Sequence, residues 1–477
     1  MKTKRRVEST MRLLVILASI ASAVVPSPLV AQPRASGDVA LVGVTVIDPA
    51  SNGPARSRQT IIVRNGRIQS IGPSTSVAIP RGMRRVMAQG KFAIPGLWDS
   101  HVHFMNTGVT ALPLLVAHGV TSVREMGGYI DSTRAWQARM RNGALVGPRI
   151  MTPGPILESP SYLQRVRDRS IRDPRIGQRI LPYRMEVGDS LTARKAIDSL
   201  VKLKVDFVKV RTMASAPAYY AILREARRAG LKVAAHQAGV VSLRNAADSG
   251  QADFEHGILP PTARLNQATR DSLYLSFAKN GVWYTPTLSV SRTLLLSGDS
   301  ATKAIFSDEA VKRDARRAYA SAWLLEWWRM QVDERVLDTA STRAAALDTA
   351  YRSSAADVRR MHQAGVPILA GTDAGSVLVY PGFSLHEELR LLVDDAGLSP
   401  REALRTATEG PAKFFGLDSM VGRIVKGQVA DIVLLDADPL ADINNTRRIF
   451  AVMQAGRLHS RRDLDAMLEN VRRVVAH

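Results

Sequence analysis

Four histidines and one aspartate follow apolar runs of the sequence, and these residue types bind metal ions and transfer protons. His101 and His103 come at the end of one such run. Residues i and i+2 of a strand point to the same side, so both imidazoles would face the same way. His236, His256 and Asp373 each end a further apolar run. Histidines and a carboxylate that converge at strand ends predict a metal site with an open position for water.

A lysine in a predicted strand is the sixth candidate ligand. In the run 205–211, alternation places Lys209 and Arg211 on one side of the strand. A lysine inside an apolar strand is costly unless it is paired or neutralised. Carbamylation by carbon dioxide would turn its ammonium into an anion that can bridge two metal ions. A salt bridge to Glu125 or Asp206 is the alternative.

Arg211 is a candidate for substrate binding. It lies two residues beyond Lys209 on the same strand face, so it would project further towards bound substrate. A guanidinium beside cations needs an anion, and its planar fork fits a carboxylate. A salt bridge to Glu158 would explain Arg211 equally well.

The elements that carry these residues predict an α/β fold. Apolar strands alternate with helical stretches through the middle of the chain, which favours a (β/α)8 TIM barrel whose catalytic residues lie at the C-terminal strand ends. Short strands at 38–90 and 431–457, with a hairpin signal at Asn65-Gly66, predict a small β-sandwich domain built from both termini. The barrel strands are expected to end near His101, Arg124, Met151, Arg211, His236, His256, Pro286 and Asp373.

The beginning of the chain resembles an export signal. Basic residues precede the apolar run 13–25, which is too short to cross a membrane but fits a secretory signal. We expect cleavage after Ala31 or Ala23, and a periplasmic or secreted protein; a retained membrane anchor is the alternative. The predicted domains are 1–31 (signal peptide), 32–92 (first part of the β-sandwich), 93–414 (metal-dependent barrel domain) and 415–477 (second part, with a C-terminal helix).

The amino-acid composition limits which metal ligands, nucleophiles and partners the chain can use. The chain has no cysteine, so disulfides, iron–sulfur clusters and thiol nucleophiles are excluded, and any metal must be bound by nitrogen and oxygen. The formal net charge is +22, but its arginines are scattered and no nucleic-acid-binding module is evident. We expect no nucleic-acid partner, no stable membrane insertion and a homo-oligomer.

Three further segments carry local predictions. Residues 299–365 are mostly helical in pattern, and Trp323 and Trp327 would share a helix face. This segment is expected to pack in the core, form a subunit contact or cover the substrate. Ser399, followed by proline and glutamate, predicts a helix start. The lipase-like tetrad 188–191 is better interpreted as another helix start than as a nucleophile motif.

Taken in order, the motifs resemble those of a known superfamily. The segment 95–103 resembles the first-strand motif of the amidohydrolase superfamily. The resemblance continues through most of residues 40–457 and is greatest to the imidazolonepropionase-related branch, which includes Xaa-Pro dipeptidases. The motifs that follow in order are 119–127, Lys209, His236, 255–257, 371–375 and 427–432.

The resemblance implies a binuclear metal hydrolase that cleaves a carbon–nitrogen amide bond. Its substrate would be an N-acyl amino acid, a dipeptide or a related amide, and we expect it to carry a carboxylate. A metal-bridging hydroxide would attack the carbonyl, and Asp373 would accept its proton and pass it to the leaving amine. Two divalent ions, with zinc expected, would be bound by His101, His103 and Asp373 at one position and by His236 and His256 at the other, with carbamylated Lys209 between them.

Two departures and two alternatives bear on this function. The segment 152–161 lacks the histidine that prolidase-like members carry after the third strand. Gly239 stands where deaminases of the superfamily have a glutamate, which argues against deamination. A lactonase or other ester hydrolase could use the same site. A non-catalytic envelope binding protein that has kept its metals is the alternative from another class.

Overall fold

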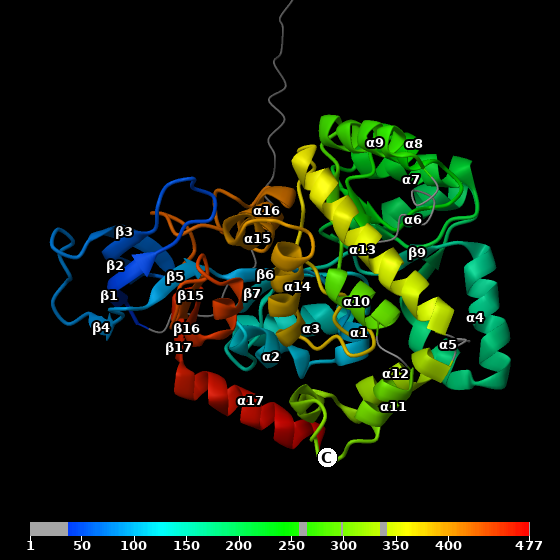
Figure 1. The fold of residues 1–477 in the computed structure, drawn as a ribbon. Helices are drawn as coiled ribbons and strands as arrows, with labels where there is room; N and C mark the ends of the chain where they lie inside the picture. Colours follow the sequence, from blue (N-terminus) through cyan, green and yellow to red (C-terminus); the bar gives the residue numbers. More distant parts are fainter. Residues whose placement is uncertain (1–36, 257–264, 297–298, 334–340, 477) are drawn as a thin grey trace, which may run out of the picture. The chain divides into compact units, whose positions relative to one another are not determined.

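The computed structural model describes residues 37–256, 265–296, 299–333 and 341–476 (Figure 1). The predicted signal segment 1–31 lies outside the described residues, and so does Gly257 of the sixth strand motif. The described residues of the central region and of the terminal strands belong to one compact unit.

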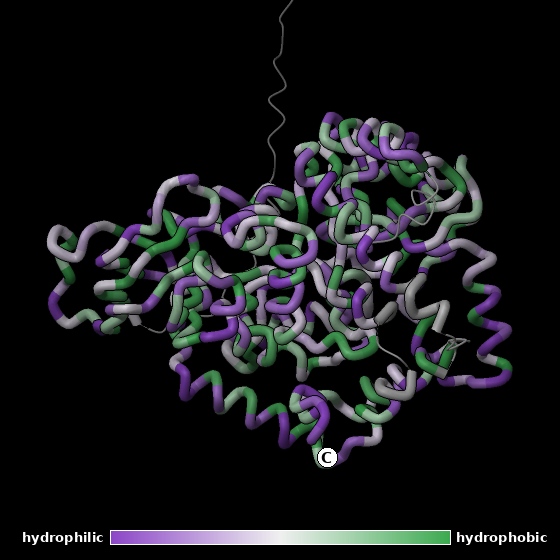
Figure 2. The backbone as a smooth tube through the Cα atoms, in the orientation of Figure 1, coloured by the Kyte–Doolittle hydropathy of each residue, from purple (hydrophilic) through white to green (hydrophobic). Residues whose placement is uncertain are grey.

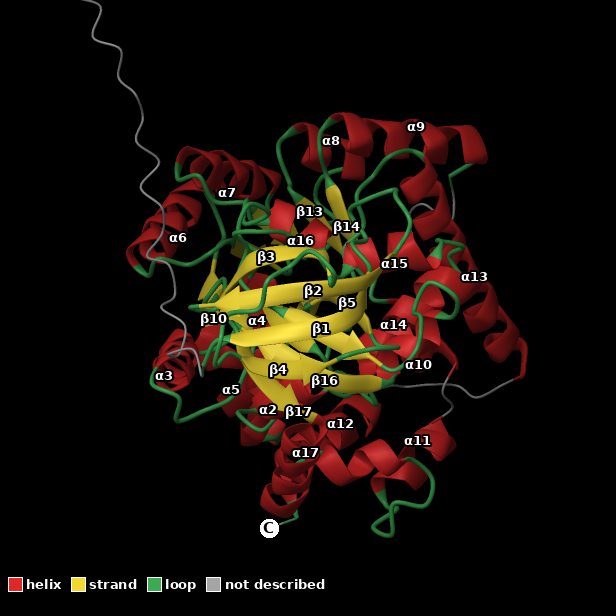
Figure 3. Cartoon of the chain, turned by 90° about the vertical axis from the view of Figure 1, so that its left-hand side faces the viewer, coloured by secondary structure: helices red, strands yellow, loops and turns green. Residues whose placement is uncertain are grey.

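One eight-stranded sheet is assembled from both ends of the chain (Figures 1 and 3). Its early strands are β1 (Val39–Val46), β2 (Arg56–Arg64), β3 (Arg67–Pro73), β4 (Arg84–Met87) and β5 (Phe92–Pro95), and its late strands are β15 (Ile432–Leu435), β16 (Ile449–Gln454) and β17 (Arg457–Ser460). The strand order is β17-β16-β15-β5-β1-β2-β3, with β4 paired to β1. The two ends meet where β5 pairs antiparallel with β15, with Ile94 opposite Val433.

The sequence pattern of this sheet explains its position. Asn65 and Gly66 join β2 to β3 with φ values of 50° and 75°, as a two-residue type I′ hairpin requires, so the hairpin prediction is confirmed. On β15, Leu434 packs with the terminal strands, whereas Val433 packs into the large cluster of the central domain. Because β15 is buried on both faces, all of its residues are apolar and do not alternate with polar ones. The expected β-sandwich is not confirmed, because the described residues of both ends lie in a single sheet.

The centre of the chain forms parallel strands separated by helices, as expected for an α/β domain. A three-stranded sheet has the order β6-β7-β8 and a six-stranded sheet the order β10-β9-β11-β12-β13-β14, and every strand pair in them is parallel. The strands are β6 (Leu97–Val102), β7 (Val120–Glu125), β8 (Arg149–Met151), β9 (Ile156–Glu158), β10 (Arg184–Glu186), β11 (Val208–Val210), β12 (Val233–Ala235), β13 (Asp253–Glu255) and β14 (Trp283–Thr285).

The last expected strand joins the two parallel sheets without forming a regular ladder. Isolated parallel bridges connect Tyr284 to Ile368 and Val102 to Ala374. The backbone between them makes hydrogen bonds to several elements, and Asp373 has a φ of 62°, which interrupts extended structure. Among the described residues the strands therefore do not form the continuous closed ladder that the sequence predicted. The short strands β9 and β10 were also not expected.

Helices follow most of the central strands and confirm the two predicted helix starts. Asp189 and Ser399 each form a capping box, so the tetrad 188–191 begins a helix. None of the described helices is both long and apolar enough to cross a membrane. The helices between β6 and β14 are α1 (Phe104–Thr107), α2 (Ala111–Ala117), α3 (Ile130–Arg141), α4 (Pro160–Arg172), α5 (Pro174–Ile180), α6 (Ser190–Lys202), α7 (Ala216–Arg228), α8 (Leu243–Asp248) and α9 (Gln267–Lys279).

The remaining helices follow β14. On α17, hydrophobic and hydrophilic residues alternate along the helix (Figure 2), and Leu464 and Val471 form its buried side. The helices are α10 (Leu288–Leu296), α11 (Asp299–Phe306), α12 (Ala322–Asp333), α13 (Ser341–Gln363), α14 (Phe383–Asp394), α15 (Pro400–Thr406), α16 (Glu409–Phe414) and α17 (Arg461–Val475).

Candidate metal centre

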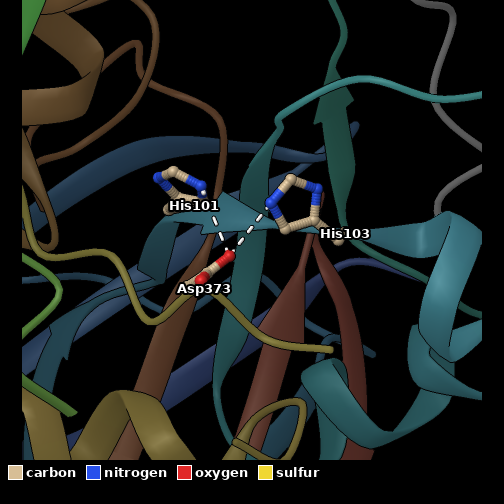
Figure 4. Close-up of side chains that lie close together, drawn as sticks. All are labelled: His101, His103 and Asp373. Carbon is tan, nitrogen blue, oxygen red and sulfur yellow. Dashed lines mark ion pairs between the residues drawn. The ribbon is translucent and has the colours of Figure 1, made fainter. Parts of the chain in front are cut away.

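Two histidines at the end of β6 face an aspartate on the turn that follows residues 368–372. Asp373 Oδ1 lies 2.9 Å from His103 Nε2 and 3.5 Å from His101 Nε2 (Figure 4). The three ligand atoms lie within 4.8 Å of one another. The backbone N–H of Asp373 donates to the carbonyl oxygen of His101 at 2.8 Å, which fixes the turn against the strand. These three residues form a group that can bind a metal ion.

The other two predicted histidines lie next to this group. His256 follows β13, and its ring centroid is 4.6 Å from that of His101 and 4.6 Å from that of His236. The Nε2 atoms of His236 and His256 are 3.1 Å apart. The Nδ1 atom of His256 lies 3.0 Å from the Thr287 hydroxyl, which fixes the ring orientation. The four predicted histidines and Asp373 therefore form one continuous cluster.

Lys209, on β11, is buried, lies close enough to influence His236 and His256 electrostatically, and has no hydrogen-bond partner at its Nζ atom. The two expected alternative partners are engaged elsewhere: Glu125 accepts from the Thr152 hydroxyl, and Asp206 accepts from the Thr152 backbone N–H. Burial lowers the pKa of Lys209 to about 8, although the carboxylate of Glu255 acts in the opposite direction. A larger share of this amine is therefore neutral near neutral pH than of an exposed lysine.

Electrostatics favour neutral imidazoles beside an ionised carboxylate. Burial lowers the pKa of His101 to about 3 and that of His256 to about 4. Burial alone would raise the pKa of Asp373, but the hydrogen bond from His103 and the nearby histidine rings hold it below its usual range. Neutral imidazole nitrogens and a carboxylate are the protonation states that bind divalent metals.

Sequence reasoning missed a buried ion network beneath His101. Glu255 Oε2 accepts a hydrogen bond from His101 Nδ1 at 2.7 Å, which leaves Nε2 directed towards Asp373. Arg124 Nη2 donates to both Glu255 oxygens at 2.9 and 3.1 Å, and Nη1 donates to Asp253 at 2.6 Å. A carboxylate behind a metal-binding histidine fixes its tautomer and orientation.

The sequence did contain a signal for this network. Arg124 ends an apolar strand, and Asp253 and Glu255 stand at alternate positions of another. Buried charges need partners, so an arginine and two acids inside apolar strands indicate an ion pair. Their pairing joins β7 to β13, and a local pattern does not give that connection.

Asp99 is a second residue that sequence reasoning missed. Its carboxylate accepts hydrogen bonds from the Thr372 hydroxyl at 2.7 Å and from the Thr372 backbone N–H at 3.0 Å. Burial raises the pKa of Asp99 to about 7, and the Thr372 hydroxyl partly offsets this rise. Asp99 therefore ties β6 to the residue that precedes Asp373.

Two residues of the cluster have unusual backbone geometry. His256 has a φ of 70° and Asp373 a φ of 62°, in the left-handed region that side chains other than glycine seldom adopt. Both residues end an extended segment. The left-handed turn therefore gives each side chain a direction that differs from the one it would have in a continuing strand. Such conformations are concentrated at functional sites.

Arg211 contacts the acid that the alternative interpretation named. Its Nη1 lies 3.4 Å from Glu158 Oε1, and its guanidinium carbon lies 4.5 Å from the Tyr162 ring centroid. Glu158 has closer partners, since Arg184 donates to it at 2.7 Å and the Thr212 hydroxyl at 2.5 Å. The Arg211 side chain remains 35% exposed. Its charge also contributes to the lowered pKa of His236, behind burial and other charges.

This arrangement matches a known family over most of the chain. The sequence model of the amidohydrolase family matches residues 92–458. The chain belongs to the amidohydrolase family. Amidohydrolases are hydrolases, so the expectation of an enzyme of this class is confirmed, and so is the resemblance of its motifs.

Individual relatives place this amidohydrolase among several hydrolases. Ochratoxinase of Aspergillus niger is 21% identical over 464 residues, which cover 87% of this chain and 85% of that protein. Imidazolonepropionase of Streptomyces griseus is 35% identical over 104 residues, 21% of this chain and 25% of that protein. A prolidase solved with N-methylphosphonate-L-proline has a TM-score of 0.67 and 21% identity, and the match covers 89% of this amidohydrolase and 100% of that chain. The prolidase match shows a shared fold.

Proposed function

We propose that this amidohydrolase cleaves the carbon–nitrogen amide bond of a small molecule, such as an N-acyl amino acid or a dipeptide, at a centre of two divalent cations. One observation carries the proposal: the four histidines and Asp373 form one cluster, and the buried amine of Lys209, which has no hydrogen-bond partner, lies near it. The names of the relatives agree with hydrolysis of amides and related bonds.

The donor atoms fit such cations. All of them are nitrogen or oxygen, the atoms that zinc and similar ions accept in proteins. The Nε2 atom of His101 and the Nζ atom of Lys209 are buried without a hydrogen-bond partner. When bound, the two ions would supply a Lewis acid and a water of lowered pKa. We propose zinc, with His101, His103 and Asp373 at one position, His236 and His256 at the other, and carbamylated Lys209 between them.

The protein's own groups would orient the ligands and move the proton. Glu255 holds His101 through Nδ1, and Arg124 holds Glu255. Asp373 is kept ionised by its histidine neighbours, and its Oδ2 accepts a hydrogen bond from the Ser376 hydroxyl at 2.7 Å. We propose that Asp373 accepts a proton from the attacking water and returns it to the leaving amine nitrogen.

Arg211 would bind a carboxylate of the substrate. Glu158 already accepts two shorter hydrogen bonds, so its contact with Arg211 at 3.4 Å is the weakest of the three. The exposed part of the guanidinium is therefore available to an anionic group, and Tyr162 supports its plane.

The remaining expectations from the sequence are also part of this proposal. The bridges at Val102 and Tyr284 support closure of the parallel strands into a (β/α)8 barrel over 93–414. The segments 32–92 and 415–477 would form the second domain, a β-sandwich. We further propose an exported homo-oligomer whose segment 1–31 is removed as a signal. Fractionation of cells that express the whole chain, with N-terminal sequencing, tests the export.

The function is tested by metal analysis together with a substrate screen. The zinc-loaded protein should contain close to two equivalents, and the Lys209→Ala variant should contain fewer. The screen should include N-acyl amino acids, dipeptides and matched lactones, with turnover expected on an amide. His362→Asn is the control variant and should keep the parent's zinc content, because His362 pairs with Glu402 at a partly exposed position outside the cluster. One equivalent in both the parent and Lys209→Ala would contradict the binuclear centre.

A further inference from the structure

The backbones next to His103 and Asp373 pack against each other. We refer to residues 103–106 and 373–376 as the two ligand turns. Gly375 has a φ of 111°, and a Cβ atom there would lie 3.0 Å from Asn106 Cβ and 3.2 Å from the carbonyl oxygen of His103. The ligand turns are therefore in close contact, and a shift of one would move the other.

Helix α12 bonds to both ligand turns. The indole N–H of Trp323 donates to the carbonyl oxygen of Met105 at 3.0 Å. The indole N–H of Trp328 donates to the carbonyl oxygen of Gly375 at 3.1 Å. Each acceptor is two residues beyond a candidate ligand, so a single helix holds the backbone on both sides of the His-His-Asp group.

Trp328 is held in a small apolar cluster. The side chain is fully buried, its ring packs edge to face on Tyr380 at 5.1 Å, and it lies 6.0 Å from the Phe306 ring. Val377 and Leu378, just after the second ligand turn, belong to the same cluster. This turn is therefore fixed both by a hydrogen bond and by packing against α12.

Arg179 holds the N-terminal half of α12. Its guanidinium carbon lies 3.4 Å from the Trp323 ring centroid and 5.9 Å from that of Trp327. Arg179 Nη2 also donates to the carbonyl oxygen of Trp323 at 3.0 Å and to Glu326 at 3.1 Å. These contacts attach α12 to α5 through Trp323, the residue that also bonds to the first ligand turn.

We propose that α12 is a brace for the metal centre, in which Trp323 and Trp328 act as positioning residues. Their indole N–H groups fix the two ligand turns, and this sets the separation of His103 from Asp373. The proposal rests on the proposed function, because it assumes that the His-His-Asp group binds a metal ion. The sequence left core packing, a subunit contact or a substrate cover as roles for the helical segment that begins at 299. The brace is a different role, because α12 would position metal ligands.

Trp327 offers a matched control on the same helix. It packs against the same apolar cluster but is partly buried, whereas Trp328 is fully buried, and the indole N–H of Trp327 has no hydrogen-bond partner. Trp327→Phe removes the same N–H group as Trp328→Phe without removing a bond to a ligand turn. The comparison therefore sets the loss of Trp328, with its bond and its packing, against the loss of a tryptophan whose N–H group bonds to neither ligand turn.

The first test is metal affinity, measured by competition between the protein and a chelator for zinc. Trp328→Phe should weaken zinc binding about tenfold, the lower end of the range for partners that orient metal ligands. Trp323→Phe should weaken it less, because Trp323 is 48% exposed and water can replace its bond. Trp327→Phe should leave it unchanged. The visible absorption of the cobalt-loaded protein should change in Trp328→Phe and not in Trp327→Phe.

The second test does not depend on metal. In the metal-free protein, amide hydrogen exchange should become faster over residues 373–379 in Trp328→Phe and stay at the parent rate in Trp327→Phe. Equal effects of Trp327→Phe and Trp328→Phe on affinity and exchange would overturn the brace, and so would parent-like values in Trp328→Phe. Failure of the proposed function would give a different result. The parent would then bind no zinc, or it would bind zinc equally well after Asp373→Asn.

Discussion

Replacing Arg124 with methionine should destabilise the folded chain by about 3–5 kcal/mol, the usual cost of removing one partner from a buried ion pair. The guanidinium is fully buried and donates to Asp253 at 2.6 Å, to Glu255 at 2.9 Å and to the Ser100 carbonyl at 2.6 Å. Its loss leaves two carboxylates in an apolar interior. With an unfolding entropy of about 2.1 cal/mol/K per residue, this predicts a melting temperature lower by about 3–5 °C.

The loss of stability in Arg124→Met should also increase with pH. Burial and the neighbouring Glu255 already raise the pKa of Asp253, although Arg124 opposes them, so removing Arg124 should raise it further. A raised pKa means that the folded chain binds a proton where the unfolded chain does not. The free energy of unfolding of the variant then falls as pH rises through this pKa. The gap between parent and variant should be larger near pH 8 than near pH 5.5.

Thermal unfolding of the metal-free protein, followed by circular dichroism at both pH values, checks this prediction. Adding Asp253→Asn to Arg124→Met should recover part of the stability at the higher pH, because one buried charge is removed. Arg64→Met is the control, since Arg64 pairs with Asp38 at an exposed site where such bonds contribute about 0–1 kcal/mol. An equal loss at both pH values, with no recovery in the double variant, would refute the reasoning.

Three further outcomes are expected. Asp373→Asn should lower kcat on the best amide substrate by at least about 10²–10⁴-fold, because an amide cannot accept the proton; a rate within tenfold of the parent would contradict this role. Arg211→Met should raise KM for a carboxylate substrate about ten- to a hundredfold and spare its methyl ester, since a charge-assisted contact contributes about 1.5–3 kcal/mol; equal effects on both would make Arg211 structural. Removal of metal by a chelator should lower the melting temperature, and zinc at about 100 times its Kd should restore about 2.7 kcal/mol; an unchanged melting temperature would argue against a bound ion.

The sequence predicted the positions of the candidate ligands because they depend on local order. His101 and Asp373 each end an apolar run, and parallel strands bring such ends to one edge of a sheet. The hairpin at Asn65-Gly66 and the cap at Ser399 are local as well, and both were predicted correctly. In each case a few neighbouring residues determine the backbone conformation.

The features that the sequence did not predict depend on distant pairs or on elements without a clear apolar pattern. Arg124 and Glu255 belong to strands that are far apart in the sequence, so no local period shows their pairing. Strands β9 and β10 lack the apolar run that marked the other central strands: β9 contributes only Ile156 and Leu157, and the residues of β10 are partly or fully exposed. The spacing of Trp323 and Trp327 predicted a shared helix face, and both rings contact Arg179, but neither that contact nor the bond from Trp328 to Gly375 could be predicted without the folded chain.

The pairing of β5 with β15 has a consequence for how this enzyme is made. While the chain is being synthesised, β5 has a free edge until the residues from Ile432 onwards have left the ribosome, and an unpaired edge invites association with other chains. Contacts between such distant segments also slow folding. A shortened gene that ends after α16 would encode every candidate metal ligand, yet its product should aggregate instead of forming a smaller active enzyme.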